Sequence, residues 1–470
     1  MDPFSVSSHF GTMAPQPLVC DPKDVSELLF DDRGSRDDDQ KTEPYIGPIQ
    51  VSWMTSSATS KSTDETQQHP KQRGLFTTRD VKAGELLFAT PPTVDAPADD
   101  VVTLWKKENS SGERSLERIA EEVLVEHMRH ALLDDSQKAI GGSFACLTGS
   151  SLSHVKTLPS FDTLNGLEHS DEDLPPFSNK DLLQLVRSNA FGPDGLCSYK
   201  FMEDTLRRQD TGSSYCPPRL LGMYPLAAMI NHSCLANAIR VFNVRGVMVV
   251  HASADIPKGK EIVWSYISPT QSLPQRQSIL RQQYSFSCLC SRCQEEDVGL
   301  YKLDNPQVSA TLDQLESAIQ QNNSPGSLQL LESLQSTEDI SNTVKRYLQV
   351  AYLPIYLQHL NSNSTGNPEM LLLLGMHLHL ACLGAHHAST EHFSVVHYCY
   401  ATASRLHSTA TDKSKTLPKL KYWTEQLKQL HMIRFGNMGH NLERVRQVMK
   451  LTRELVTSPS ASGRGRLLVL

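Results

Sequence analysis

The sequence lacks the features that are typical of membrane-embedded, exported and duplex-wrapping proteins. No uninterrupted apolar run approaches roughly 18 residues, and the N-terminus has no apolar signal core. Positive charge is not in excess either, because 45 Lys and Arg residues stand against 52 Asp and Glu residues, a net charge of −7. A mildly acidic chain does not favour wrapping of duplex nucleic acid. We therefore expect neither membrane association nor direct nucleic-acid binding.

The ten cysteines show no pattern of a disulfide-rich secreted protein. Instead, Cys288, Cys290 and Cys293 form a Cys-x-Cys-x-x-Cys motif, and Cys234 directly follows Asn-His-Ser. Four thiolates suit a closed, tetrahedral structural zinc site with Zn–S distances of about 2.3 Å. The alternative is that these cysteines are small buried apolar residues or disulfide partners. We expect them to bind one structural zinc ion, in a protein of the nucleus or the cytoplasm.

The chain of 470 residues is long enough for two or more domains. Residues 1–45 are Ser-rich and then acidic, with little apolar periodicity, and are predicted to be disordered. Residues 461–470 are predicted to be a flexible tail.

Short strands alternate with a few helices up to about residue 296. Apolar alternation between turn residues predicts strands at 49–53, 73–76, 86–88, 238–242, 247–252 and 262–264. Helical spacing of apolar residues is present between Ala98 and Asp134, and the Ser/Gly-rich stretch from there to about Pro176 is predicted to be a loop. Shorter helices are predicted at 181–187 and 275–283.

From Asp297 onward, apolar residues recur at helical spacing. The predicted helices include 344–360, 370–385, 393–406 and 420–430. Short connections between them indicate antiparallel pairs in a solenoid-like array. Six histidines of this region are expected to be solvated or to pack between helices rather than to bind a second metal: His377, His379, His386, His387, His392 and His397.

Several motifs resemble those of SET-domain lysine methyltransferases of the SMYD type. They are Gly222–Leu226, Asn231–Cys234, Lys258–Ile262, Ser265–Ile267 and Tyr284-x-Phe286-x-Cys288. The resemblance runs from about Gly47 to Glu295 and is strongest from Ser188 onward. It implies an α+β protein with a β-rich SET domain and post-SET zinc knot at 46–296, an insertion at 98–180, and an all-α, tetratricopeptide-like domain at 297–460. It also implies that residues 73–88 form an opening hairpin, with its turn at Ala83–Gly84.

The resemblance further implies a protein-lysine N-methyltransferase that uses S-adenosylmethionine. Tyr266 and Tyr284 match the catalytic tyrosines, which line a narrow channel where desolvation lowers the pKa of the lysine. The residues matched to cofactor contacts are Arg73, Gly74, Asn189, Asn231, His232, Tyr266 and Phe286. Taken alone, Arg73–Gly74 is a plain turn, Asn189 a left-handed helix cap, and Asn231–His232 a pair of turn residues.

The chain departs from the family at two places. Gln72 stands where the family has the first glycine of its Gly-x-Gly motif, and only Cys146 lies between Phe88 and Lys180, where a MYND zinc finger would need several cysteines. These departures favour an alternative, a catalytically silent SET-fold protein that acts as a zinc-stapled scaffold. A zinc-thiolate redox sensor is a third hypothesis, which leaves the tyrosines unexplained. We expect a monomer with a protein substrate and with protein partners on the helical domain.

Overall fold

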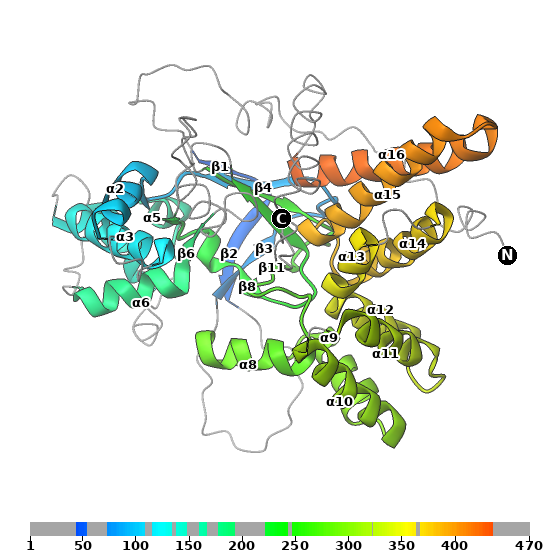
Figure 1. Cartoon of the computed structure of the whole chain (residues 1–470). Coiled ribbons are helices and arrows are strands. Elements are labelled where there is room, and N and C mark those ends of the chain that lie inside the picture. Colours follow the sequence, from blue (N-terminus) through cyan, green and yellow to red (C-terminus); the bar gives the residue numbers. More distant parts are fainter. Residues whose placement is uncertain are drawn as a thin grey trace. The chain divides into compact units, whose positions relative to one another are not determined.

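The computed structural model describes residues 44–53, 73–108, 115–133, 138–147, 159–166, 177–192, 221–242, 247–321, 323–362 and 367–435 (Figure 1). These residues fall into two compact units. The sheet unit contains 44–231 and 240–263, and the helical unit contains 232–239 and 264–435. Residues 1–45 were predicted to be disordered and 461–470 to be flexible; 1–43 and 461–470 lie outside the described residues, and the prediction is wrong at Tyr45, which lies in a strand.

The first sheet has the strand order β1-β4-β10-β9. Its strands are β1 (Tyr45–Ile46), β4 (Leu86–Thr90), β10 (Met248–Ala252) and β9 (Ala238–Phe242). Every residue of β4 and β10 is buried, which explains why these strands are apolar on both faces instead of alternating.

The second sheet has the order β2-β3-β11-β8. Its strands are β2 (Ile49–Trp53), β3 (Arg73–Thr77), β11 (Glu261–Trp264) and β8 (Asn231–His232). Leu75 pairs with Ile262 across β3 and β11, and both are fully buried. This register also places Glu261 opposite Phe76 and therefore next to Gly74.

The predicted hairpin between 73 and 88 is wrong, because β3 and β4 belong to different sheets. The connection between them is too long for a tight hairpin turn. It pairs elsewhere: Val81 bridges Ile256, and the Gly84 N–H donates to the Ala252 carbonyl.

A small third sheet lies within a helical cluster of the sheet unit. The sheet, in the order β5-β7-β6, contains β5 (Val94–Ala96), β7 (Leu221–Met223) and β6 (Ala190–Phe191). The main helices are α2 (Ala98–Glu108), α3 (Leu116–Leu133) and α6 (Asn179–Asn189), whose apolar faces share one core with the sheet. Ser178 and Asp181 form a capping box that starts α6.

The prediction that the segment before Pro176 is a loop is wrong in two places. Helices α4 (Lys138–Ala145) and α5 (Phe161–Leu164) lie there. Ile140 and Phe144, four positions apart on α4, pack into the core of α2, α3 and α6. The small residues around this pair hid the helical pattern in the sequence.

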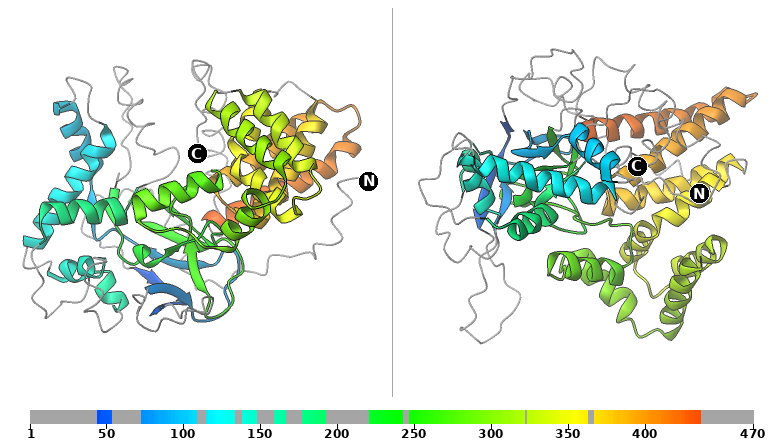
Figure 2. Two further views of the ribbon diagram at one scale, coloured as in Figure 1. Left: turned by 90° about the horizontal axis from the view of Figure 1, so that it is seen from below. Right: turned by 60° about the vertical axis from the view of Figure 1, so that its left-hand side comes forward.

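The helical unit begins with α8 (Leu273–Tyr284), α9 (Ser291–Glu296) and η7 (Asp297–Tyr301), a turn of π-helix. It continues with α10 (Pro306–Gln320), α11 (Ser324–Ser336), α12 (Asn342–Ala351), α13 (Leu353–Ser362), α14 (Pro368–Ala385), α15 (Thr390–Thr409) and α16 (Lys413–Phe435). Contacts between α10 and α11, and of α15 with α14 and α16, give the expected helical array (Figure 2).

The single helix predicted at 344–360 is two helices, α12 and α13, which break at Tyr352. Pro354 has no N–H to donate to a carbonyl of α12, so the helix cannot continue through it, whereas the first turn of α13 tolerates it because those N–H groups have no partner within the helix.

By length and composition, helix α14 could cross a membrane, although Glu369, His377 and His379 interrupt its apolar residues; the expected lack of membrane association stays a prediction. Half of it is buried within the protein, which is equally typical of a core helix.

Candidate functional site

The four predicted metal ligands meet in the helical unit. Their sulfur atoms all lie within 4.8 Å of one another. Cys234 Sγ lies 3.6 Å from Cys293 Sγ and 4.0 Å from Cys288 Sγ. Tetrahedral zinc with Zn–S bonds of about 2.3 Å separates its sulfurs by about 3.8 Å, whereas a disulfide brings two sulfurs to about 2.05 Å. All four cysteines are free, so the geometry is that of a metal site and not of disulfides.

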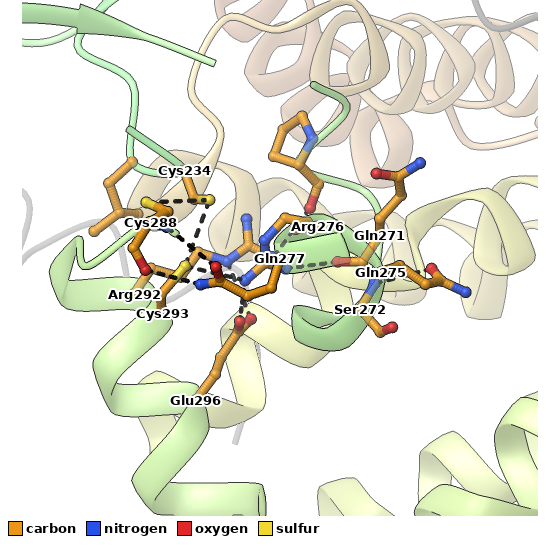
Figure 3. A network of polar contacts seen from close by, with 12 residues as sticks. Cys234, Gln271, Ser272, Gln275, Arg276, Gln277, Cys288, Arg292, Cys293 and Glu296 are labelled. Atoms are coloured by element: carbon orange, nitrogen blue, oxygen red, sulfur yellow. Dashed lines mark hydrogen bonds and ion pairs between the residues drawn. The ribbon is translucent and has the colours of Figure 1, made fainter. Parts of the chain in front are cut away.

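Helix α8 positions the cysteine loop. The helix ends at Tyr284, and its C-cap Ser285, in the left-handed conformation (φ 61°), turns the chain toward the Cys-x-Cys segment. The Gln277 side chain clamps Cys288 from both sides: its Nε2 donates to the Cys288 carbonyl over 2.8 Å, and its Oε1 accepts from the Cys288 N–H over 3.1 Å (Figure 3). Cys290 is then the N-cap of α9, which carries Cys293.

A buried cluster of charged side chains lies beside the cysteines, and its charge shows whether the surroundings suit zinc. The side chains of Arg276 and Arg292 are 0% exposed, and that of Glu296 between them is 2% exposed. Arg276 contacts Glu296 and lies 3.9 Å from Cys293 Sγ, while Arg292 Nε lies 3.1 Å from Glu296 (Figure 3). Two guanidinium groups against one carboxylate leave one positive charge in excess.

An unbalanced charge at such depth is costly unless an anion lies beside it. A zinc ion with four thiolates carries a net charge of −2 and supplies that anion. Moreover, within the described residues Arg276 Nε and Arg292 Nη1 are buried without hydrogen-bond partners. The surroundings of the cysteines therefore fit one zinc ion bound as a tetrathiolate.

The two predicted catalytic tyrosines also come together in the helical unit. The Tyr266 and Tyr284 ring centroids are 5.0 Å apart, and Phe286 lies 6.4 Å and 6.5 Å from them. Tyr266 follows strand β11, whereas Tyr284 is the last residue of α8. All three rings are half-buried, so they form an aromatic wall that remains open to a ligand.

His232 lies between this aromatic wall and the cysteines. Its Nδ1 accepts the backbone N–H of Tyr266 over 3.0 Å, and its Nε2 lies 3.4 Å from Cys234 Sγ. Its ring centroid is 5.3 Å from that of Tyr266. The side chain therefore contacts a metal ligand and the tyrosine segment, a role that the sequence did not indicate.

In the sheet unit, Asn231 and Gly74 meet around a residue that was not predicted. The Asn231 Nδ2 donates to the Arg73 carbonyl and to Glu261 Oε1, each over 2.7 Å. A Cβ on Gly74 would lie 2.6 Å from Glu261 Oε1 and 3.1 Å from Asn231 Nδ2. Burial raises the pKa of the Glu261 carboxyl, and the bond from Asn231 opposes that shift. Gly74 is thus required because this hydrogen-bonded pair occupies the space of a side chain.

The other two predicted cofactor residues are held by local contacts. The Arg73 guanidinium donates to the Cys146 carbonyl, and burial lowers its pKa. Asn189 is the last residue of α6, and its Nδ2 donates to the Leu185 carbonyl over 3.2 Å. The left-handed cap considered for Asn189 is wrong, because among the described non-glycine residues only Ser285 and Ala388 have positive φ.

Comparison with known proteins agrees with these motifs. A SET domain model matches residues 72–267. Histone-lysine N-methyltransferase ASHR1 of Arabidopsis thaliana is 45% identical over 76 residues, 16% of each chain. Histone-lysine N-methyltransferase set5 of Schizosaccharomyces pombe is 36% identical over 85 residues, 18% of this chain and 27% of that one. Human histone-lysine N-methyltransferase SMYD3 is 38% identical over 77 residues, 16% of this chain and 18% of that one.

The chain thus aligns with between 16% and 27% of the length of these relatives. A solved structure of Rubisco LSMT bound to AdoMet aligns with 87% of this chain and 88% of its own chain, at 12% identity and a TM-score of 0.27. This similarity carries no functional argument. The chain therefore matches a SET domain model at residues 72–267 and is similar to SMYD-type and other histone-lysine methyltransferases.

Proposed function

We propose that this protein is a protein-lysine N-methyltransferase that uses S-adenosylmethionine. The observation that carries the proposal is the Tyr266–Tyr284 pair, whose ring centroids lie 5.0 Å apart next to Phe286, at the end of a matched SET domain. Paired tyrosines with an apolar neighbour suit a narrow channel for one lysine side chain. The relatives' names support lysine as the acceptor.

The chain offers two groups of residues for the cofactor. In the sheet unit, the bonds from Asn231 Nδ2 to Arg73 and Glu261 fix the orientation of the Asn231 amide. In the helical unit, Phe286 and Tyr266 offer aromatic surface. When bound, S-adenosylmethionine would supply a methyl group on a sulfonium. Gly74, Asn189 and Asn231 in the sheet unit, and Tyr266 and Phe286 in the helical unit, stay predicted contacts for it.

The protein's own contribution is alignment and desolvation. Methyl transfer to an amine needs a neutral nitrogen, and an aromatic channel lowers the pKa of lysine because desolvation disfavours the ammonium form. The tyrosine hydroxyls then hydrogen-bond to the amine and orient its lone pair, so that binding energy is used for positioning. The nitrogen lone pair would form the new nitrogen–carbon bond as the methyl–sulfur bond of the sulfonium breaks and leaves a neutral thioether, and the resulting ammonium would then lose a proton to water. This chemistry demands no side-chain nucleophile.

The decisive experiment measures cofactor binding and methyl transfer separately. Calorimetry with S-adenosylmethionine should detect binding by the zinc-loaded full-length protein, and labelled cofactor should transfer methyl groups to protein lysines in an extract. Tyr266→Phe keeps the ring and removes the hydroxyl, so it should bind the cofactor like the wild type and transfer methyl roughly 10²- to 10³-fold more slowly.

Two further variants sharpen this test. Asn231→Ala should lose cofactor binding first, and Tyr400→Phe on α15, outside the aromatic wall, should change neither quantity. If the zinc-loaded wild type neither binds the cofactor nor transfers methyl groups, the protein is instead a silent zinc-stapled scaffold. We also propose that it acts as a monomer in the nucleus or cytoplasm, with the helical array binding protein partners.

A further inference from the structure

We propose that His232 is a positioning residue that makes the order of Tyr266 depend on zinc binding by Cys234. The proposal rests on the zinc site and, for its effect on catalysis, on the methyltransferase function proposed above. It assigns to the His232 side chain a role separate from any contact with the cofactor. The three groups lie in a row: the Tyr266 backbone N–H, the imidazole of His232, and Cys234 Sγ.

The direction of each hydrogen bond follows from elementary bonding. The Tyr266 N–H can only donate, so Nδ1 of His232, 3.0 Å away, must present its lone pair. A neutral imidazole has one lone pair and one N–H, so the proton is on Nε2. That N–H lies 3.4 Å from Cys234 Sγ, a distance suited to a hydrogen bond to sulfur.

Cys234 must then accept this hydrogen bond, which a thiolate does far better than a thiol. Cys234 is buried, with 1% of the residue exposed, so water does not replace the imidazole as its partner. Ligation to zinc together with the other three cysteines would fix Cys234 Sγ in place beside the imidazole. Zinc binding therefore strengthens the bond that holds the imidazole, as is general for groups around metal ligands.

The other end of the row reaches the proposed catalytic group. The imidazole holds the backbone of Tyr266 at the residue that carries the ring, and its own ring lies 5.3 Å from the Tyr266 ring. Tyr266 in turn packs against Tyr284 at 5.0 Å. Loss of zinc would weaken the hydrogen bond between His232 and Cys234. The imidazole would then be held less firmly, and Tyr266 would become less ordered.

Two substitutions separate the halves of this row in the full-length protein. His232→Asn keeps an amide oxygen near the position of Nδ1 and loses the donor to Cys234. His232→Gln places an amide near the position of Nε2 and loses the acceptor for the Tyr266 N–H. His377→Gln, at an exposed position on α14, is the control. Each protein is first shown to hold about one metal ion per chain.

Cobalt replaces zinc in the first measurement, because its thiolate charge-transfer bands report the hydrogen bond to sulfur. We expect the bands to move to lower energy in His232→Asn and to stay in place in His232→Gln. Hydrogen exchange of the Tyr266 amide should be faster in His232→Gln than in His232→Asn. Methyl transfer by His232→Gln should fall about 10- to 100-fold.

Unchanged bands in His232→Asn, or unchanged exchange of the Tyr266 amide in His232→Gln, would overturn the proposal. Both readouts are independent of turnover. A wild-type protein without methyl transfer would therefore refute the proposed function and still leave the role of His232 decided by the spectra and the exchange rates.

Discussion

Replacing Gly74 by alanine tests the role of the Asn231–Glu261 pair directly. The added methyl group would lie 2.6 Å from Glu261 Oε1, 3.1 Å from Asn231 Nδ2 and 3.3 Å from Phe76 Cε2. The first distance is far below van der Waals contact, so the Glu261 carboxylate, at the end of a flexible side chain, must shift, and we expect the shift to weaken its hydrogen bond with Asn231. Because Glu261 is paired through β11 with β3, its backbone has little freedom to follow.

The expected cost is that of one hydrogen bond to a charged group, about 1.5–3 kcal/mol. Reduced freedom of the unfolded chain with alanine offsets about 0.4–1 kcal/mol of this. We therefore expect a net loss of about 0.5–2.5 kcal/mol in the free energy of unfolding, measured by urea titration. Affinity for S-adenosylmethionine should fall as well, since the Asn231 amide loses its fixed orientation.

Gly384→Ala provides the matched control. Gly384 lies within α14, and a Cβ there would meet only Arg346 atoms, at 3.9 Å and beyond. Alanine in a helix interior is favoured over glycine by about 1 kcal/mol, so this variant should be more stable than the wild type. In the double variant Gly74→Ala/Glu261→Ala, the second change should cost less than it does alone. A Gly74→Ala protein with wild-type stability and cofactor affinity would refute the assigned role of the pair.

Three further predictions concern the helical unit. Cys290→Ser should lose the single zinc ion, which contributes about 10 kcal/mol of gross folding energy in sites of this kind, as elemental analysis would show. Arg276→Gln should weaken zinc binding in a chelator competition, because it removes positive charge beside the thiolates, whereas Glu296→Gln should not weaken it; equal losses in both variants would argue against charge balance. Burial lowers the pKa of His379 from 6.5 to about 4. Between these pH values the unfolded chain therefore binds a proton at His379, whereas the folded chain does not. Stability is complete above about pH 6.5 and should fall by about 3 kcal/mol toward pH 4, in urea titrations at several pH values, with a flatter profile for His379→Gln.

The sequence predicted best the features that depend on local spacing. Cys288, Cys290 and Cys293 share one short turn, so their meeting needed only the local chain, and Cys234 was found through the motif that precedes it. The tyrosines were found through their match to motifs of the family that the sequence resembles. Both groups are brought together as expected.

Features that depend on strand partners were missed. The opening hairpin failed because β3 and β4 pair with different, distant strands, a choice that neither segment encodes by itself. Glu261 was overlooked for the same reason: in the sequence it is one charged residue of a turn, and only the β3–β11 register sets it beside Gly74. Arg276 and Arg292 resembled surface residues of polar helices, because their burial depends on a carboxylate 20 and 4 residues away.

The same charge cluster bears on where the SET region ends. The sequence places the boundary after Glu296, but α9 continues directly into η7, and the Arg292 guanidinium lies 5.6 Å from the Tyr347 ring centroid of α12. Gly299 of η7 packs so closely on α12 that a Cβ there would lie 2.8 Å from Val344. A chain ending at Glu296 would lose this cover and expose the two arginines to water, so we expect it to aggregate or to hold well below one zinc ion per chain. A soluble truncated protein with full zinc content and wild-type cofactor affinity would contradict this expectation and establish the boundary after Glu296.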